Sequence, residues 1–261
     1  MKHCLTIAGS DCSGGAGIQA DLKTFSALGC YGMSVITSVV AENTAQVISS
    51  MTVSAQVISD QLEAVFSDIR VDAVKIGMLP DEAAMIAVSQ VLKKYRPKIV
   101  VCDPVMLATA GTELMQSSAL GTFAGEIIPQ CTMLTPNIPE AETLIGNRIS
   151  NVEDMKSAAE KIRSLGAKSV LIKGGHLTGA ALDILYDGER FYEFSHERIN
   201  SSATHGTGCT LSSAIAAFMA RGESPERAAA LAKEYLTGAI EHGLNIGKGH
   251  GPTNHFYRFF E

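Results

Sequence analysis

Short apolar runs alternate along this chain with longer segments of helical periodicity. Strands are predicted at 5–8, 34–40, 73–78, 99–102, 133–135, 169–173, 182–186 and 190–194, and helices at 16–28, 59–69, 81–95, 152–165, 209–220 and 225–242. Short strands that are apolar throughout are typical of a parallel sheet covered by helices on both faces. The pattern predicts an α/β sandwich of three layers. Asp187-Gly188, between the last two strands, indicates an antiparallel hairpin at one edge.

The chain of 261 residues contains no Pro/Gly/Ser-rich spacer, so a single domain over 1–261 is expected. Its formal net charge of −6 and its lack of a basic tract argue against nucleic acid or an anionic membrane as a partner. No apolar run is long enough to span a bilayer. Six scattered cysteines without a CxxC pair are typical of buried thiols in a reducing cytoplasm, which is the location we expect.

Glycine or polar residues follow the first six predicted strands, and a glycine loop comes later in the chain. They occur at 9–21, 42–44, 77–78, 103–106, 136–140, 173–176 and 206–208. Ligands of such sheets bind beyond the carboxyl ends of the strands. We therefore expect one composite site at this edge. The glycine spacing after the first strand matches neither the dinucleotide-binding nor the Walker motif.

Residues 204–210, Thr-His-Gly-Thr-Gly-Cys-Thr, lead into a run rich in small and apolar residues. This is typical of a tight loop that enters a helix N-terminus, where unpaired N–H groups and the helix dipole bind anions. Gly206, Thr207 and Gly208 would form an anion cradle, and the positive end of the helix would favour a thiolate at Cys209. The alternative is a glycine-rich loop whose cysteine only packs the helix.

Asp103 and Glu140 end strands and suit a hard cation such as Mg²⁺, and Lys173 can neutralise phosphate oxygens. With the anion cradle, they indicate phosphoryl transfer, which mainly requires positioning and charge stabilisation. Each residue also has a purely structural interpretation: Asp103 in a turn before Pro104, Glu140 as a helix cap and Lys173 in a surface salt bridge.

Residues 7–23, IAGSDCSGGAGIQADLK, resemble the opening of the hydroxymethylpyrimidine/phosphomethylpyrimidine kinases of thiamine biosynthesis, which belong to the ribokinase-like superfamily. Further blocks resemble this family in the same order, at 75–79, 103–106, 135–142, 173–176, 205–210 and 249–252. The resemblance spans nearly the whole chain. A cysteine at 209 resembles the branch that also contains the pyridoxal kinases, whereas sugar kinases usually carry an aspartate there.

The resemblance implies a role for each matching position. Cys209 matches the catalytic base, and Asp21 matches the residue that binds the substrate hydroxymethyl group. The positions that match the lining of the pyrimidine pocket are Gly9, Met78 and Val105. Asn137 and Glu140 match the NxxE motif that organises Mg²⁺ and phosphate, and Lys173 matches a lysine near the nucleotide phosphates.

The implied reaction is ATP-dependent phosphorylation of 4-amino-5-hydroxymethyl-2-methylpyrimidine, and then of its monophosphate to the diphosphate. ATP and Mg²⁺ are the expected cofactors, and a homodimer is the family expectation.

Glu42 departs from the family, which commonly has glutamine at this position as the contact to the aminopyrimidine edge. A glutamine amide both donates and accepts, whereas an ionised carboxylate only accepts. Glu42 can replace glutamine if a proton lies between the carboxylate and the ring nitrogen. We therefore expect pH-dependent binding of an aminopyrimidine. The alternative is that Glu42 points elsewhere and the pocket takes another substrate.

Two other functions stay open on sequence alone. One is a pyridoxal, pyridoxine or pyridoxamine kinase, because that branch shares the cysteine-bearing loop. The other is a non-catalytic phosphometabolite-binding protein, which would need the anion loop but not Asp103, Glu140 and Cys209 together.

Overall fold

The computed structural model describes residues 1–107, 114–175 and 181–259, and its central element is one sheet. The strands of the described chain are β1 (Lys2–Asp11), β2 (Cys30–Glu42), β3 (Val47–Thr52), β4 (Ala73–Ile76), β5 (Val100–Cys102), β6 (Met133–Leu134), β7 (Ser169–Lys173), β8 (Ala181–Tyr186) and β9 (Phe191–His196). Their order is β3-β2-β1-β4-β5-β6-β7-β8-β9. The six inner strands, β2-β1-β4-β5-β6-β7 in sheet order, pair in parallel. β3 at one edge and β8 and β9 at the other are antiparallel additions.

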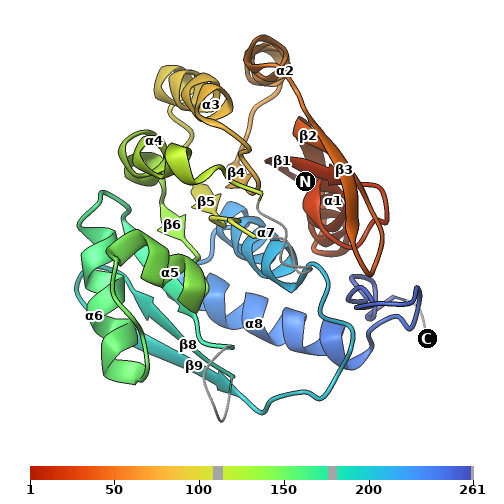
Figure 1. Cartoon of the computed structure of the whole chain (residues 1–261), viewed down its shortest axis with the longest axis vertical. Coiled ribbons are helices and arrows are strands. Elements are labelled where there is room, and N and C mark those ends of the chain that lie inside the picture. Colours follow the sequence, from red (N-terminus) through yellow and green to blue (C-terminus); the bar gives the residue numbers. More distant parts are fainter. Residues whose placement is uncertain (108–113, 176–180, 260–261) are drawn as a thin grey trace.

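Helices cover both faces of the sheet (Figure 1). One apolar core lies between the sheet and α2 (Ala55–Asp68), α3 (Glu82–Tyr95), α5 (Ile138–Ile145), α6 (Val152–Arg163) and the short helical segments over 117–130, which include α4 (Leu120–Thr122). The other core lies between the sheet and α1 (Gly17–Ala27), α7 (Thr207–Ala220) and α8 (Pro225–Glu241). The predicted three-layer, mostly parallel α/β fold is confirmed, as is the hairpin, formed by β8 and β9.

The edge next to β2 differs from the prediction. β3 pairs antiparallel with β2, so the sheet carries an antiparallel strand at this edge as well. Most of its six residues are exposed, and its sequence is half polar. It therefore lacks the apolar signal that marks the inner strands.

Local capping explains where the helices around the site begin. Asp81 caps α3 as predicted, because its side chain accepts a hydrogen bond from the Ala84 N–H. The helix α5, which was not predicted, begins with a capping box between Asn137 and Glu140. Among the described residues, no helix is both long and apolar enough to cross a bilayer.

Candidate active site

A cavity of about 980 Å³ lies at the carboxyl edge of the parallel strands. This volume suits two small ligands side by side or one extended ligand. The predicted site residues that line it are Gly9, Glu42, Met78, Asp103, Val105, Asn137, Glu140, Lys173, Gly206, Thr207, Gly208 and Cys209. The carboxyl-edge rule therefore brings together residues from seven segments of the chain.

The loop before α7 adopts the geometry of an anion cradle. Gly206 has φ = +77°, and a Cβ there would come within 1.9 Å of the Gly15 carbonyl oxygen. A Cβ at Gly208 would lie 2.9 Å from Asp103 Oδ2 and 3.4 Å from Lys173 Nζ. Glycine is thus needed at 206 for the loop to pass the backbone of Gly15, and at 208 for the first turn of α7 to approach Asp103 and Lys173.

Cys209 is half-buried in the first turn of α7, and its thiol is near a backbone N–H of Gly17. Burial raises the pKa of Cys209 to about 11; the positive charge of Lys75 lowers it, whereas Asp21 and Asp103 raise it further. The expected thiolate at the helix end is not supported, because burial is the largest influence on this thiol and raises its pKa. Cys209 is a thiol at neutral pH.

Asp21 does not line the cavity. It is fully buried and paired with Lys75, whose Nζ lies 2.8 and 2.9 Å from the two carboxylate oxygens. Thr6 Oγ1 and Ser213 Oγ donate to the same carboxylate at 2.5 and 2.6 Å. The predicted direct contact of Asp21 with a substrate hydroxymethyl group is therefore corrected: both of its oxygens are occupied within the protein.

Lys75 is the group that connects Asp21 to the site, and the sequence analysis did not identify it. Burial alone would lower the pKa of Lys75, but the charge of Asp21, followed by those of Cys209 and Asp103, raises it. Lys75 is therefore a permanent ammonium beneath the thiol of Cys209. A lysine inside the otherwise apolar β4 was the available signal.

Lys173 lies among buried carboxylates. Its Nζ is 2.5 Å from Asp103 Oδ1 and 3.9 Å from Glu140 Oε2. Glu140 Oε2 also accepts the Asn137 N–H at 2.7 Å, and Asn137 Oδ1 accepts the Glu140 N–H at 2.9 Å. The capping alternative for Glu140 is therefore correct, and the same side chain also lines the cavity.

Glu140 carries the surplus charge of this cluster. Burial, and to a smaller extent the charge of Asp103, raises the pKa of Glu140 to about 7, although Lys173 opposes the shift. Two buried carboxylates thus face one ammonium group. Such a donor set has room for a further positive charge.

One end of the cavity is narrow and apolar. A Cβ at Gly9 would come 3.0 Å from Met78 Sδ, so Gly9 and Met78 are in close approach across the ends of β1 and β4. These strands flank the point where the sheet order reverses, at which α/β folds bind ligands. Val105 completes this end. These three residues give the cavity an apolar wall.

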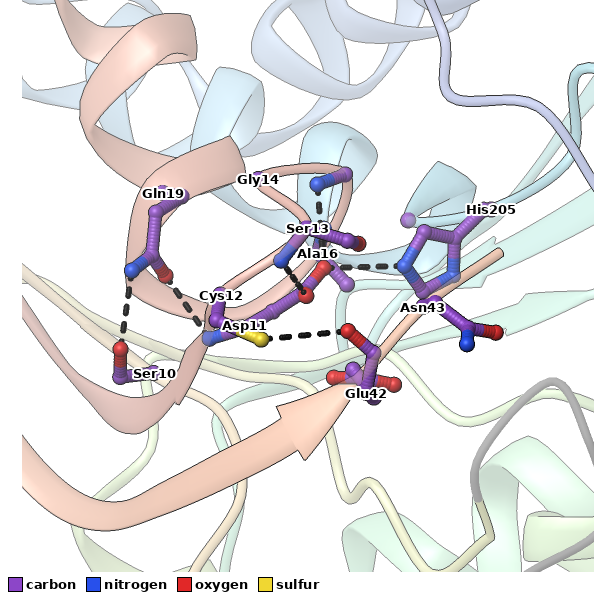
Figure 2. Close-up of polar contacts among 12 residues, drawn as sticks. Ser10, Asp11, Cys12, Ser13, Gly14, Ala16, Gln19, Glu42, Asn43 and His205 are labelled. Atoms are coloured by element: carbon purple, nitrogen blue, oxygen red, sulfur yellow. Dashed lines mark hydrogen bonds and ion pairs between the residues drawn. The ribbon is translucent and has the colours of Figure 1, made fainter. Parts of the chain in front are cut away.

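Three titratable side chains meet where β1 and β2 end, next to Gly9 in the chain (Figure 2). Asp11, Glu42 and His205 line the cavity, and one ligand atom of each lies within 4.8 Å of the others. His205 Nε2 lies 2.9 Å from Asp11 Oδ2. Glu42 therefore faces the cavity as expected, whereas Asp11 and His205 were not identified as site residues.

The other end of the cavity was also missed. It is formed by Lys233, Leu236, Thr237 and Ile240 on α8 and by Asp183 on β8. Lys233 Nζ and Asp183 Oδ2 form a buried ion pair at 2.6 Å, and Asp183 Oδ1 accepts the Gly174 N–H at 2.9 Å. The alternation of polar and apolar residues along 225–242 predicted a helix but not which side it presents to a ligand. His176, part of one motif, lies outside the described residues.

The parallel sheet with its carboxyl-edge cavity, the anion cradle and the buried lysine–carboxylate cluster define a ribokinase-like phosphotransferase of small molecules. The family model described as phosphomethylpyrimidine kinase matches residues 11–254. The chain belongs to this family.

Relatives of similar length support the assignment. A hydroxymethylpyrimidine/phosphomethylpyrimidine kinase of Bacillus subtilis is 45% identical over 98% of this chain and 95% of its own length. The corresponding protein of Rhizobium meliloti is 47% identical over 98% of both. A thiamine biosynthesis bifunctional protein of Geobacter sulfurreducens is 50% identical, and the match spans 96% of this chain but only 51% of that protein.

Solved structures fall in two groups. A pyridoxal kinase of Bacillus subtilis in complex with ADP matches the whole of both chains with a TM-score of 0.92 and 39% identity. A phosphomethylpyrimidine kinase from Clostridium difficile matches 92% of this chain and all of its own with a TM-score of 0.83 and 48% identity. The fold is thus common to both activities, and the sequence identity is higher with the pyrimidine kinase.

Proposed function

We propose that this protein transfers the γ-phosphoryl group of ATP to 4-amino-5-hydroxymethyl-2-methylpyrimidine, and then to the monophosphate, in thiamine biosynthesis. One observation carries the proposal: a single cavity joins an apolar end at Gly9 and Met78, which we propose as the ring-binding end, to an anion cradle at 206–208. A ring bound at that end places its substituent beside the cradle. The names of the relatives support the choice of pyrimidine.

The residues divide the work of phosphoryl transfer. Lys173 and the first-turn N–H groups of α7 take up charge on the transferred group. The substrate hydroxyl loses its proton to the thiolate form of Cys209, which has already released its own proton to solvent and becomes a thiol as the new O–P bond forms. Lys75, which lowers the pKa of Cys209, stabilises that thiolate.

The donor set of Asp103 and Glu140 fits Mg²⁺. Both carboxylates are buried and Lys173 neutralises only part of their charge. A divalent cation bound here would neutralise the rest and would screen the phosphates of the nucleotide. The end of the cavity along α8 is the proposed place for the nucleoside of ATP.

A second candidate is a pyridoxal kinase, favoured by the TM-score of 0.92 with the Bacillus subtilis enzyme. A homodimer and a cytoplasmic location complete the proposal. They rest on the family resemblance and on six free cysteines.

The test is ATP-coupled turnover with Mg²⁺ on hydroxymethylpyrimidine, its monophosphate and pyridoxal, side by side. Both pyrimidines are expected to turn over, with a higher kcat/KM than pyridoxal. A higher kcat/KM for pyridoxal would replace the proposal with the second candidate. Binding of ATP without turnover of any of the three would leave the phosphometabolite-binding protein as the better account.

A further inference from the structure

Three titratable side chains from distant parts of the chain meet at the ring-binding end of the cavity (Figure 2). Asp11 ends β1, Glu42 ends β2, and His205 immediately precedes the anion cradle. We call these three residues the triad. All of them line the cavity, so a ligand that lies on Gly9 and Met78 lies beside the triad.

Asp11 is fixed as a carboxylate. Its Oδ1 accepts the Ser13 N–H at 2.7 Å, and its Oδ2 accepts the N–H groups of Gly15 at 3.0 Å and Ala16 at 2.7 Å, in addition to the contact with His205. Burial would raise the pKa of Asp11, but the hydrogen bonds from His205, Ser13 and Ala16 outweigh it and lower the pKa. Asp11 is therefore not available to bind a ligand cation.

His205 pairs with Asp11. Burial lowers the pKa of His205, but the hydrogen bond to Asp11 and the charges of Asp11 and Glu42 raise it overall. The proton on Nε2 is directed at Asp11, and together the two residues form a compensated pair. A glutamine at position 42 would place no charge beside this pair, whereas the glutamate adds one further carboxylate.

Glu42 carries that additional charge. Burial and then the charge of Asp11 raise the pKa of Glu42, and His205 lowers it. Other titratable residues near the triad make hydrogen bonds away from the Glu42 carboxylate. Cys12 Sγ donates to the Glu42 backbone carbonyl at 3.1 Å, and Lys23 Nζ donates to the Gly14 carbonyl at 2.7 Å. The Lys248 N–H donates to Thr44 Oγ1 at 3.1 Å, and His250 Nδ1 lies 3.2 Å from Thr204 Oγ1. The triad thus favours one more proton or cation at the Glu42 carboxylate.

We propose that the triad makes this pocket select the amidinium form of its ligand: a ring whose amino group and protonated ring nitrogen donate two parallel hydrogen bonds to Glu42. The 4-aminopyrimidine of the proposed function has this donor pattern when its ring is protonated, so the identity of the substrate rests on that proposal. The selection of an amidinium does not. His205 acts as a positioning residue, because it occupies Asp11 and leaves Glu42 for the ligand.

The preference has a clear physical basis. A carboxylate that accepts two hydrogen bonds from a cation forms a charge-assisted pair, which is about twice as strong as its neutral equivalent. A neutral amide ligand offers Glu42 an N–H group but also a carbonyl oxygen, which faces the carboxylate unfavourably. The difference corresponds to about a tenfold change in Kd.

The experiment compares two flat probes of the same shape, benzamidine and benzamide, by isothermal titration calorimetry at pH 8. Wild-type protein is expected to bind benzamidine about tenfold more tightly than benzamide. Glu42→Gln is the matched variant and is expected to abolish this preference. Equal affinity of the wild type for the two probes, failure of benzamidine to bind, or an unchanged preference in Glu42→Gln would overturn the proposal.

The role of His205 has its own readout. Benzamidine affinity is expected to fall as the pH drops through the pKa of Glu42, because protonation removes the carboxylate charge. His205→Gln keeps a donor to Asp11 but removes the positive charge that lowers this pKa, so the midpoint of the fall is expected at higher pH. An unchanged midpoint would overturn the positioning role.

The outcomes for substrate and triad are separable. If the wild-type protein shows no preference for benzamidine but turns over hydroxymethylpyrimidine, the proposed selection of an amidinium by the triad is overturned and the proposed function stands. A preserved preference without such turnover would overturn the proposed function and support a different amidinium substrate.

Discussion

Two aspartates ten residues apart, Asp11 and Asp21, each meet a cationic side chain, yet the two groups differ in every other respect. The Asp21–Lys75 pair is fully buried, and the hydroxyl groups of Thr6 and Ser213 complete its hydrogen bonds. The Asp11–His205 pair lines the cavity and has Glu42 beside it as an additional charge. The first group is closed, because it is shielded from the cavity and its charges balance. The second is open, because it faces the cavity and Glu42 adds a negative charge to it.

The difference separates structural from ligand-binding electrostatics. A buried pair with all its hydrogen bonds satisfied holds segments together and has no valence left for a ligand. An open group with an unbalanced charge gains a partner when a ligand binds. The first turn of α7 joins the two groups, because Cys209 lies above Lys75 and His205 precedes Gly206.

The largest effect is expected from breaking the closed pair. Lys75→Met leaves Asp21 as an unpaired buried charge and is expected to destabilise the fold by about 3–5 kcal/mol. Urea unfolding measures the change. The double variant Asp21→Asn/Lys75→Met removes both charges and is expected to lose less stability than Lys75→Met alone. Equal losses would contradict the account of a charge-balanced pair.

Crowding the turn that joins the groups is expected to impair activity more than stability. A Cβ at Gly208 would displace Asp103 or Lys173, which lie 2.9 and 3.4 Å away, so Gly208→Ala is expected to lower kcat about 10²-fold. Gly121→Ala is the control, since a Cβ there meets open space. Steady-state kinetics of both variants make the comparison. Equal kcat values would show that this turn does not position the reacting groups.

The reactivity of Cys209 tests how far the positive charge of Lys75 offsets the effect of burial on the pKa of the thiol. With a pKa of about 11, the thiolate fraction and the rate of alkylation by iodoacetamide are expected to rise about tenfold per pH unit between about pH 7 and 9. The exposed Cys12 is replaced by serine so that it does not react. Alkylation is expected to abolish activity, and bound substrate to protect against it. A rate independent of pH in this range would mean that Cys209 is already a thiolate.

Much of the fold and part of the site follow from the sequence. Short strands such as Val100–Cys102 are apolar throughout, and this pattern predicts the parallel sheet without knowledge of distant contacts. The carboxyl-edge rule then places Asp103, Lys173 and the loop at 206–208 in one cavity. The edge strand β3 has no such pattern and was missed.

The rest depends on long-range contacts or on a balance of energies. His205 meets Asp11 from 194 residues away, and neither local periodicity nor the strand-end rule predicts that pairing. The state of Cys209 depends on whether burial or the helix end dominates, and only the packing decides this. For Asp21, the family resemblance gave a role, but its buried partner Lys75 was not predicted, although a lysine within an apolar strand was a signal of one.

The most direct test of the open group is the number of protons taken up when hydroxymethylpyrimidine binds at pH 8. Calorimetric titration in two buffers of different ionisation enthalpy measures this number. Wild-type protein is expected to take up about one proton, because Glu42 and the ring share one in the complex, and Glu42→Gln is expected to take up none. Zero uptake by the wild type, or the same uptake by both proteins, would contradict the account.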